Sequence, residues 1–288
     1  KADVDIQLLT NPGIRHSSVT DYGISIAENR FDTLYLMDIE ERDSLDNVMT
    51  GSKQAQDDDP IQPSIRFTTQ GFTGRSLNTS FAAAYFPDIN LSILKSDGTR
   101  TSKLVPPTVA VLGAYATNDS IGQSWFAPAG NTRGVIGNAT STELGFLERP
   151  NLDTLYSADI NPINTSINNG VVIQGQKTLL KALSALDRVN VRRLLITVRR
   201  AVRNIANTLI FEPNRPETLN QFRSLVNPVL ESLKSQQGVS RYKVVIDETT
   251  TTQADIENNT IRGKIYLQPV RVAEFIALDF NINNQIID

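Results

Sequence analysis

Residues 4–37 read VDIQLLTNPGIRHSSVTDYGISIAENRFDTLYLM, and this stretch decides the fold. Residues 4–9 alternate as a strand does and stop at the turn signal Asn11-Pro12-Gly13. Ser17 or Ser18 can cap a helix that runs to Asn29, because a serine hydroxyl accepts a hydrogen bond from a free N–H of the first turn. Residues 33–37 form a short apolar run typical of a buried strand. A strand, a helix and a strand at this spacing predict a βαβ unit.

The C-terminal half predicts two long helices followed by strands. Apolar residues recur at helical spacing from Val191 to Leu209, and Pro213 ends that helix. Pro216 begins a second helix, which Gly238 ends, because proline suits the first turn of a helix and glycine the position after its last turn. We expect strands at 242–246, 261–267 and 273–282.

The middle of the chain is mixed in its signals. We expect two short strands within 80–95, a helix over 109–115 that Pro106-Pro107 opens, and a strand at 171–173, whereas 119–149 predicts irregular structure. The fold class is therefore α/β in the mixed α+β sense: a mixed β-sheet with flanking helices and an extended C-terminal β-strand arm. We expect a core over 1–268, with a βαβ-like part over about 1–75 and the main part over about 76–268, and an arm over 269–288.

Composition excludes several classes of protein. The chain has 288 residues and no cysteine, so disulfides and thiolate metal sites are not available. No apolar run approaches the roughly 20 residues of a membrane helix. The first residue is Lys1 rather than Met, so we expect the chain to be part of a longer protein.

Charge is unevenly distributed along the chain. The net charge is −3, but residues 1–60 hold thirteen acidic and five basic side chains, a balance of −8. Residues 177–203 hold eight basic side chains against one acid, a balance of +7. Such polarity can serve oriented contact between copies or with a charged partner, or it can reflect solvated faces that happen to differ.

Residues 170–178, GVVIQGQKT, are the nearest approach to a catalytic motif. A phosphate-binding loop needs Lys directly after the second Gly, but Gln176 separates Gly175 from Lys177. Residues 244–247, VVID, could imitate a magnesium-binding strand end, yet buried strands often end in Asp. We therefore predict no nucleotide hydrolysis.

The sequence predicts no catalytic residue, no metal site and no cofactor-binding site. His16 is the single histidine and is expected to be exposed in a loop, so the usual zinc sites and a histidine-based triad lack their residues. The acidic run 57–59 lacks the alternate-residue spacing of a calcium loop.

A cluster of arginines follows the predicted helix from Val191 to Leu209. Arg192, Arg199, Arg200 and Arg203, with Arg193 beside them, are expected to lie mostly on its polar face. The chain as a whole is acidic and no aromatic residues interleave with the arginines, which argues against nucleic acid. We predict contacts to a carboxylate-bearing protein partner; plain solvation of the helix surface is the alternative.

Several short segments carry a resemblance to a known family. They are Val105-Pro106-Pro107, Gly113-Ala114-Tyr115-Ala116 with Asp119 and Gly122, Trp125-Phe126-Ala127-Pro128-Ala129-Gly130, Asn161-Pro162-Ile163, Gly175-Gln176-Lys177-Thr178-Leu179, Asn190-Val191-Arg192-Arg193, Phe211-Glu212-Pro213-Asn214, and Pro269 followed by Ala273-Glu274-Phe275-Ile276. Their order and spacing resemble those of the contractile phage tail sheath family. One departure is Gln176-Lys177, where many relatives have a small residue and Arg, which puts in doubt only a contact made there.

The resemblance implies a structural subunit, not an enzyme, that polymerises in stacked six-membered rings around a tail tube and contracts to drive the tube through the target cell envelope. The implied partners are the protein itself, the tail tube protein, and baseplate and tail terminator proteins, with no cofactor, no nucleic acid and no membrane insertion. The implied location is the virion tail, after assembly in the host cytoplasm. Two alternatives stay open: the sheath of a bacteriocin, secretion or other contractile injection device, and a doubly wound α/β enzyme such as an NTPase.

In such relatives terminal strands cross to neighbouring subunits, and the end of this chain suits that role. In the segment Ala273 to Ile282, one face of a strand would carry Ile276, Leu278, Phe280 and Ile282, and the other face begins with Phe275. One face is thus strongly apolar and needs a cover. We predict an inter-subunit arm formed by Phe275, Ile276, Leu278, Phe280 and Ile282; an intramolecular last strand is the alternative.

Overall fold

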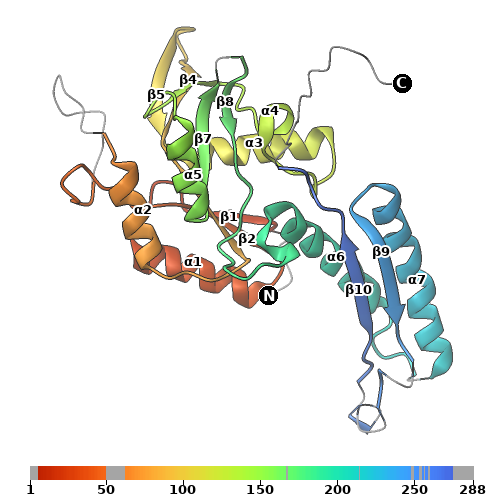
Figure 1. The fold of residues 1–288 in the computed structure, drawn as a ribbon. Helices are drawn as coiled ribbons and strands as arrows, with labels where there is room; N and C mark the ends of the chain where they lie inside the picture. The colour runs from red at the N-terminus through yellow and green to blue at the C-terminus, as the bar shows by residue number, and fades with distance from the viewer. Residues whose placement is uncertain are drawn as a thin grey trace, which may run out of the picture.

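The protein is described from a computed structural model that covers residues 6–49, 62–166, 168–213, 215–247, 250–252, 255, 257–258 and 260–274 (Figure 1). Its centre is a five-stranded sheet in the order β1-β2-β3-β7-β8. These strands are β1 (Leu8–Thr10), β2 (Leu34–Asp38), β3 (Ala82–Phe86), β7 (Ile160–Ser166) and β8 (Gly170–Ile173). The first four run parallel and β8 is antiparallel to β7, so the sheet is mixed as predicted.

The predicted βαβ unit is present. Helix α1 (Ser17–Arg30) connects β1 to the parallel neighbour β2, and all five residues of β2 are buried. The cap differs from the prediction: the His16 side chain accepts a hydrogen bond from the Ser18 N–H, so the capping residue is His16 and not a serine. His16 is exposed, as expected.

Helices cover both faces of the central sheet because its strands are apolar on both sides. On one face, Tyr35, Met37 and Phe86 pack with side chains of α1, α2 (Ile65–Gly74) and α5 (Arg149–Ser157). On the other face, Leu36 and Tyr85 pack with α3 (Pro107–Ile121) and the start of α6 (Val189–Thr208). The core therefore lies in two layers, one on each side of the sheet.

A second, antiparallel sheet has the order β5-β4-β6 and lies at one end of the molecule (Figure 1). It contains β4 (Ile89–Leu94), β5 (Arg100–Val105) and β6 (Ala139–Thr142). The two short strands predicted within 80–95 correspond to β3 and β4. The segment 119–149 is less irregular than predicted, because it contributes β6 and the short helix α4 (Gly130–Arg133).

The C-terminal part forms a small layer of its own. Helices α6 and α7 (Pro216–Ser235) pack against a two-stranded antiparallel sheet of β9 (Val239–Val245) and β10 (Lys264–Pro269) (Figure 1). A one-turn 3₁₀ helix, η1 (Ala185–Asp187), precedes α6. The two long predicted helices are confirmed. Of the predicted last strand, 273–282, only Ala273 and Glu274 lie within the described residues, and neither is in a strand.

Among the described residues, no helix is both long enough and apolar enough to cross a membrane.

Candidate functional site

Helix α6 places its arginines differently from the prediction. Arg192 is buried at 8% exposure, and its guanidinium donates to the backbone oxygen of Ser80 at 3.2 Å and to the Ser80 hydroxyl. It also lies 3.9 Å from the centre of the Phe81 ring. Burial, and then the nearby Arg199, lower the pKa of Arg192 to about 10. The placement of Arg192 on a polar, outward face was therefore wrong: the first two turns of α6 are surrounded by the protein, so this guanidinium has its partners inside the chain.

The neighbouring Arg193 is also enclosed, at 2% exposure. Its guanidinium holds the Asp119 carboxylate at the end of α3 and lies 5.1 Å from the centre of the Tyr115 ring. This pair links α6 to α3 and explains why a basic residue occupies an interior position.

The remaining three arginines lie near the turn between α1 and β2. Arg200 donates to the backbone oxygen of Asp32 at 3.0 Å and to that of Ile6, and Arg203 lies 3.8 Å from the Asp32 carboxylate. Arg199 is exposed and lies 4.8 Å from the centre of the Phe31 ring. Of the four arginines predicted to contact a partner, Arg199 is thus the one that is exposed as a residue, and Arg203 is partly exposed.

The segment that imitates a phosphate loop is used for packing. Residues 170–173 form β8, so the Gly-rich turn of a phosphate cradle is replaced by an extended strand. The Lys177 ammonium donates to the Tyr156 backbone oxygen at 2.7 Å and to Asp159 at 3.1 Å. Asp247 follows β9, which belongs to a different sheet. The geometry of a nucleotide site is not assembled from these residues.

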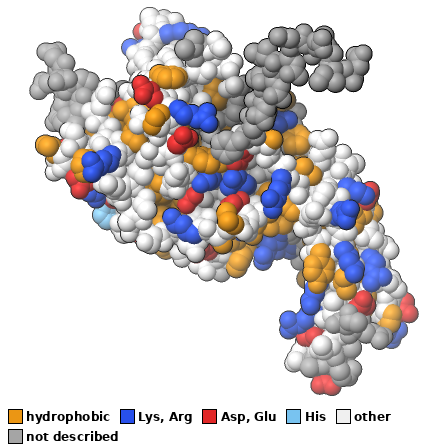
Figure 2. Space-filling model, in the orientation of Figure 1, with side chains coloured by type: hydrophobic (Ala, Val, Ile, Leu, Met, Phe, Trp, Pro, Cys, Tyr) orange, Lys and Arg blue, Asp and Glu red, His pale blue; other side chains and the backbone are white. Residues whose placement is uncertain are grey.

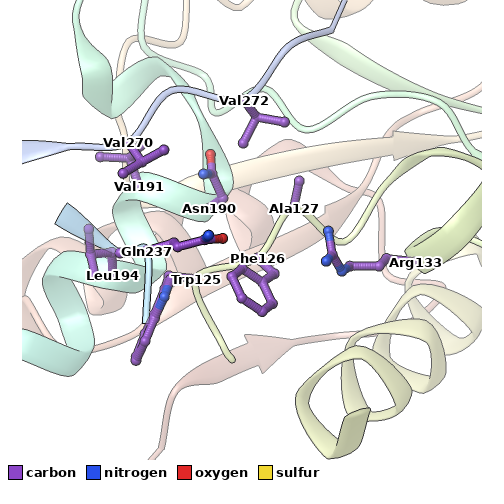
Figure 3. Close-up of a pocket in the computed structure, with 11 residues that line it drawn as sticks. Trp125, Phe126, Ala127, Arg133, Asn190, Val191, Leu194, Gln237, Val270 and Val272 are labelled. Atoms are coloured by element: carbon purple, nitrogen blue, oxygen red, sulfur yellow. The ribbon is translucent and has the colours of Figure 1, made fainter. Parts of the chain in front are cut away.

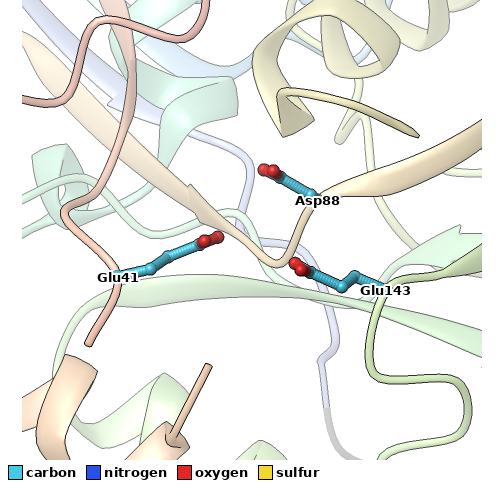
Figure 4. Close-up of side chains that lie close together, drawn as sticks. All are labelled: Glu41, Asp88 and Glu143. Atoms are coloured by element: carbon cyan, nitrogen blue, oxygen red, sulfur yellow. The ribbon is translucent and has the colours of Figure 1, made fainter. Parts of the chain in front are cut away.

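Three carboxylates that the sequence did not single out lie close together. Glu41, Asp88 and Glu143 point toward one another (Figure 4), with ligand oxygens within 4.8 Å. The Arg15 guanidinium pairs with Glu41 at 2.6 Å and also with Asp88. Carboxylate oxygens of this kind suit a hard cation, but the arginine already supplies positive charge here, and the arrangement joins the loop after β1 to both sheets.

A pocket of about 180 Å³ lies where the C-terminal layer meets the rest of the protein (Figure 3). Trp125 and Leu194 lie at one end and Arg133 at the other, with Phe126, Asn190 and Gln237 between them. The Trp125 indole donates to the Gln236 backbone oxygen at 3.2 Å. Most residues that line this pocket are apolar, and none is placed for catalysis. We therefore interpret the pocket as a gap in the packing where two parts of the fold meet.

The outer face of the β9–β10 sheet carries positive charge. Arg241 and Lys243 on β9 and Lys264 on β10 are exposed, and Tyr266, which lies opposite Lys243, is 56% exposed. Within the described residues these three cations have no ion-pair partner. Figure 2 shows Lys and Arg side chains gathered with apolar ones over this part of the surface. The other face is covered by α6 and α7, so the basic face is available for contact.

Both outer edges of this sheet are also unpaired, because β9 and β10 pair only with each other among the described strands. The two edges therefore present backbone N–H and C=O groups that could bond to a further strand.

Comparison with known proteins identifies the relatives of this chain. Residues 182–283 match the family described as the phage tail sheath C-terminal domain. The tail sheath protein of Vibrio phage KVP40 is 34% identical over 179 residues, which are 62% of this chain and 26% of that protein. Over the matched residues, this chain is similar to phage tail sheath proteins. The tail sheath protein of Enterobacteria phage T4 is 32% identical over the same length, 62% of this chain and 27% of that protein. The chain thus spans about a quarter of the length of the curated relatives it matches.

Solved structures share the fold of this chain. The PVC sheath complex of an extracellular contractile injection system, in its contracted state, superposes with a TM-score of 0.74 at 24% identity, covering 98% of this chain and 72% of that chain. The helical sheath of the anti-feeding prophage in its contracted state gives a TM-score of 0.70 at 20% identity, covering 96% of this chain and 69% of that chain. The predicted mixed α/β fold and the predicted resemblance are both confirmed, whereas the C-terminal arm stays a prediction.

Proposed function

We propose that this protein is the structural subunit of a contractile sheath, which polymerises around a tail tube and contracts to drive the tube through a target cell envelope. The observation that carries the proposal is the match of residues 182–283 to the tail sheath C-terminal domain, because that range contains α6, α7, β9 and β10 complete. The names of the curated relatives and the contracted sheaths among the fold relatives support the same role.

Self-assembly is supported by the β9–β10 sheet. Its two unpaired edges can each accept a strand, and strand addition supplies backbone hydrogen bonds worth a net ~0.5–1.5 kcal/mol each. We infer that the arm of a neighbouring copy, within residues 269–288, adds to this sheet. The chain would then be connected to its neighbours by backbone bonds that survive rotation of the subunits.

The further partners follow from the same proposal. A tail tube protein would lie inside the sheath, and baseplate and tail terminator proteins would meet its two ends. The exposed Arg199 and the basic face of Arg241, Lys243 and Lys264 favour carboxylate-bearing surfaces on the tube or on an adjoining subunit. The sequence relatives come from phages and the fold relatives include injection systems, so the proposal covers a sheath of either kind of device.

The proposed role requires no catalytic turnover. Lys177, the lysine of the segment that resembles a phosphate loop, is bound to Asp159 and to the backbone oxygen of Tyr156. ATP hydrolysis above background that disappears in Lys177→Ala would contradict this part of the proposal.

Electron microscopy of the purified protein tests the assembly directly. The proposal predicts tubes built from stacked rings, either with tube protein present or as contracted tubes without it. Monodisperse particles at every concentration and salt tried, with and without the tube protein, would overturn it.

A further inference from the structure

The carboxylate of Glu274 lies in a built site made by three distant parts of the chain. Arg188, just before α6, donates Nε to Oε1 at 2.7 Å and a terminal nitrogen to Oε2 at 3.0 Å. Tyr156 of α5 donates its hydroxyl to Oε2, and the Gln176 amide donates to Oε1 at 3.2 Å. Four hydrogen bonds thus hold one carboxylate, and two of them form the parallel pair typical of an arginine fork.

The groups that hold Glu274 are themselves fixed. The Lys177 ammonium lies 4.3 Å from the centre of the Tyr156 ring, and Arg188 pairs with Asp187 at 3.2 Å. The backbone oxygen of Gln176 accepts from the Val189 N–H at 2.8 Å, which joins the end of β8 to the start of α6. The groups that hold the Glu274 carboxylate therefore also have partners of their own in the body of the protein.

The segment that leads to Glu274 has few other hydrogen bonds among the described residues. After β10 ends at Pro269, the Val270 N–H donates to the Gly238 oxygen at 3.2 Å. Within the described residues, Arg271, Val272 and Ala273 add no hydrogen bond, and Val270 and Val272 are 38% and 45% exposed. In Figure 1 the segment leaves β10 and crosses toward α3 and α4. At Glu274 the segment 270–274 is thus bound to the body of the protein again.

We propose that Glu274 is a positioning residue: its site on Arg188, Tyr156 and Gln176 is the fixed point from which the C-terminal arm leaves the subunit. The inference rests on the proposed sheath function. A neighbour that holds the arm would pull on the chain beyond Glu274. In the described chain β10 pairs only with β9. The force would therefore separate β10 from β9 unless the chain is held at a point between β10 and the arm. The Glu274 site bears the force that the neighbouring subunit exerts on the arm, and the β9–β10 sheet stays paired during contraction.

The attachment is tested on the unassembled protein by amide hydrogen exchange. In Glu274→Ala and in Arg188→Ala we expect residues 264–274 to exchange at least roughly tenfold faster, since charge-assisted bonds of this kind are lost. Glu274→Gln keeps one acceptor oxygen and should be intermediate. Glu212→Gln, an exposed carboxylate change, is the matched control and should exchange as the parent does. Equal exchange in all variants would overturn the attachment.

The mechanical role is tested in assembled sheaths. We expect Glu274→Ala sheaths to break into short pieces on contraction, whereas parent and Glu212→Gln sheaths stay whole. Glu274→Ala sheaths that contract intact, despite faster exchange, would overturn this role. A parent protein that never assembles would instead contradict the sheath function, and the exchange result would still decide whether Glu274 is attached.

Discussion

Arg193 of α6, which is 2% exposed, forms a two-bond ion pair with Asp119 of α3. One guanidinium nitrogen lies 2.9 Å from Oδ1, and a second donates to Oδ2. Removing one partner of such a pair leaves a buried charge without compensation. We expect Asp119→Ala to lower the free energy of unfolding by about 2–3 kcal/mol, near the low end of the usual range because Asp119 is partly exposed. Urea unfolding of the isolated protein measures this.

Two comparisons sharpen the measurement. Asp153→Ala breaks a 3.8 Å pair between two exposed side chains, Asp153 and Arg149, and should cost less than ~0.5 kcal/mol. The double variant Asp119→Leu with Arg193→Met removes both charges and should be more stable than Asp119→Ala. The single variants Asp119→Leu and Arg193→Met complete the comparison. If the double variant loses as much free energy of unfolding as the two single variants together, the pair is not coupled.

Arg199 is expected to act between subunits and not within one. Its guanidinium is exposed over Phe31, so Arg199→Glu should change the unfolding free energy by less than ~1 kcal/mol. The same change should slow sheath assembly, and the difference from the parent should shrink as salt is raised, because the Debye length is about 8 Å at physiological salt. Light scattering during assembly at several salt concentrations measures both effects.

The matched control for Arg199 is Arg149→Glu, an exposed reversal on α5. If both reversals leave assembly and its salt dependence unchanged, Arg199 makes no such contact. Arg200 and Arg192 are unsuited to this test, because each donates hydrogen bonds inside the chain and its loss would disturb folding.

The buried tyrosine pair predicts instability in alkali. Burial raises the pKa of Tyr115 to about 12, from an ordinary 10.0, and burial raises that of its neighbour Tyr85 as well. The folded protein holds the Tyr115 proton more tightly than the unfolded chain does. The resulting stability is therefore fully present below pH 10 and is lost as the pH rises to about 12. We expect Tyr115 alone to lower the free energy of unfolding by roughly 2–3 kcal/mol as the pH rises from 10 to about 12.

Tyr115→Phe should remove the loss of unfolding free energy that is due to Tyr115. Part of the loss at high pH should remain, because burial also raises the pKa of Tyr35 to about 12. Tyr22→Phe, at an exposed position, should leave the pH profile as it is in the parent. Urea unfolding at pH steps from 9 to 12 gives the comparison. A profile of Tyr115→Phe that coincides with that of the parent would contradict the assignment.

The sequence predicts the elements that have a clear apolar period. Helices α6 and α7 are examples, since their apolar stripes pack on the same small core around Val226 and Leu230. Strand β7 was missed because its sequence, INPINTS, contains a proline and two asparagines and resembles a loop. In the fold, Asn161 donates to the Ala84 oxygen at 3.0 Å and Asn164 bonds to both backbone groups of Leu147. Tertiary hydrogen bonds thus outweigh local propensity.

The arginines show a different limit. The helical period identifies which residues share a face, but it does not say whether that face meets solvent or another part of the protein. Arg192 and Arg193 lie in the turns of α6 that are buried on nearly every side, and their partners Ser80 and Asp119 are distant in sequence. The attachment of Glu274 to Arg188 was beyond prediction for the same reason, since 86 residues separate them.

The arm itself remains a prediction, because residues 275–288 lie outside the described part of the chain. Deleting them keeps Glu274 and all the described helices and strands, from β1 to β10. If the arm adds a strand to a neighbouring subunit, the truncated protein should be folded, with the unfolding free energy of the parent, and should not polymerise. A truncated protein that is unfolded or aggregated would instead favour an intramolecular last strand.

Substitutions at full length separate the two faces of the arm. Ile276→Ser, Leu278→Ser and Phe280→Ser together remove the apolar face that a neighbour would cover, and burial of such side chains is worth about 1.5–3 kcal/mol each. We expect this variant to stay monomeric. The matched control, Ala277→Ser, Asp279→Ser and Asn281→Ser, changes the opposite face and should assemble. Sedimentation and negative-stain images of both variants give the readout; equal assembly of the two would mean that the apolar face makes no contact between subunits.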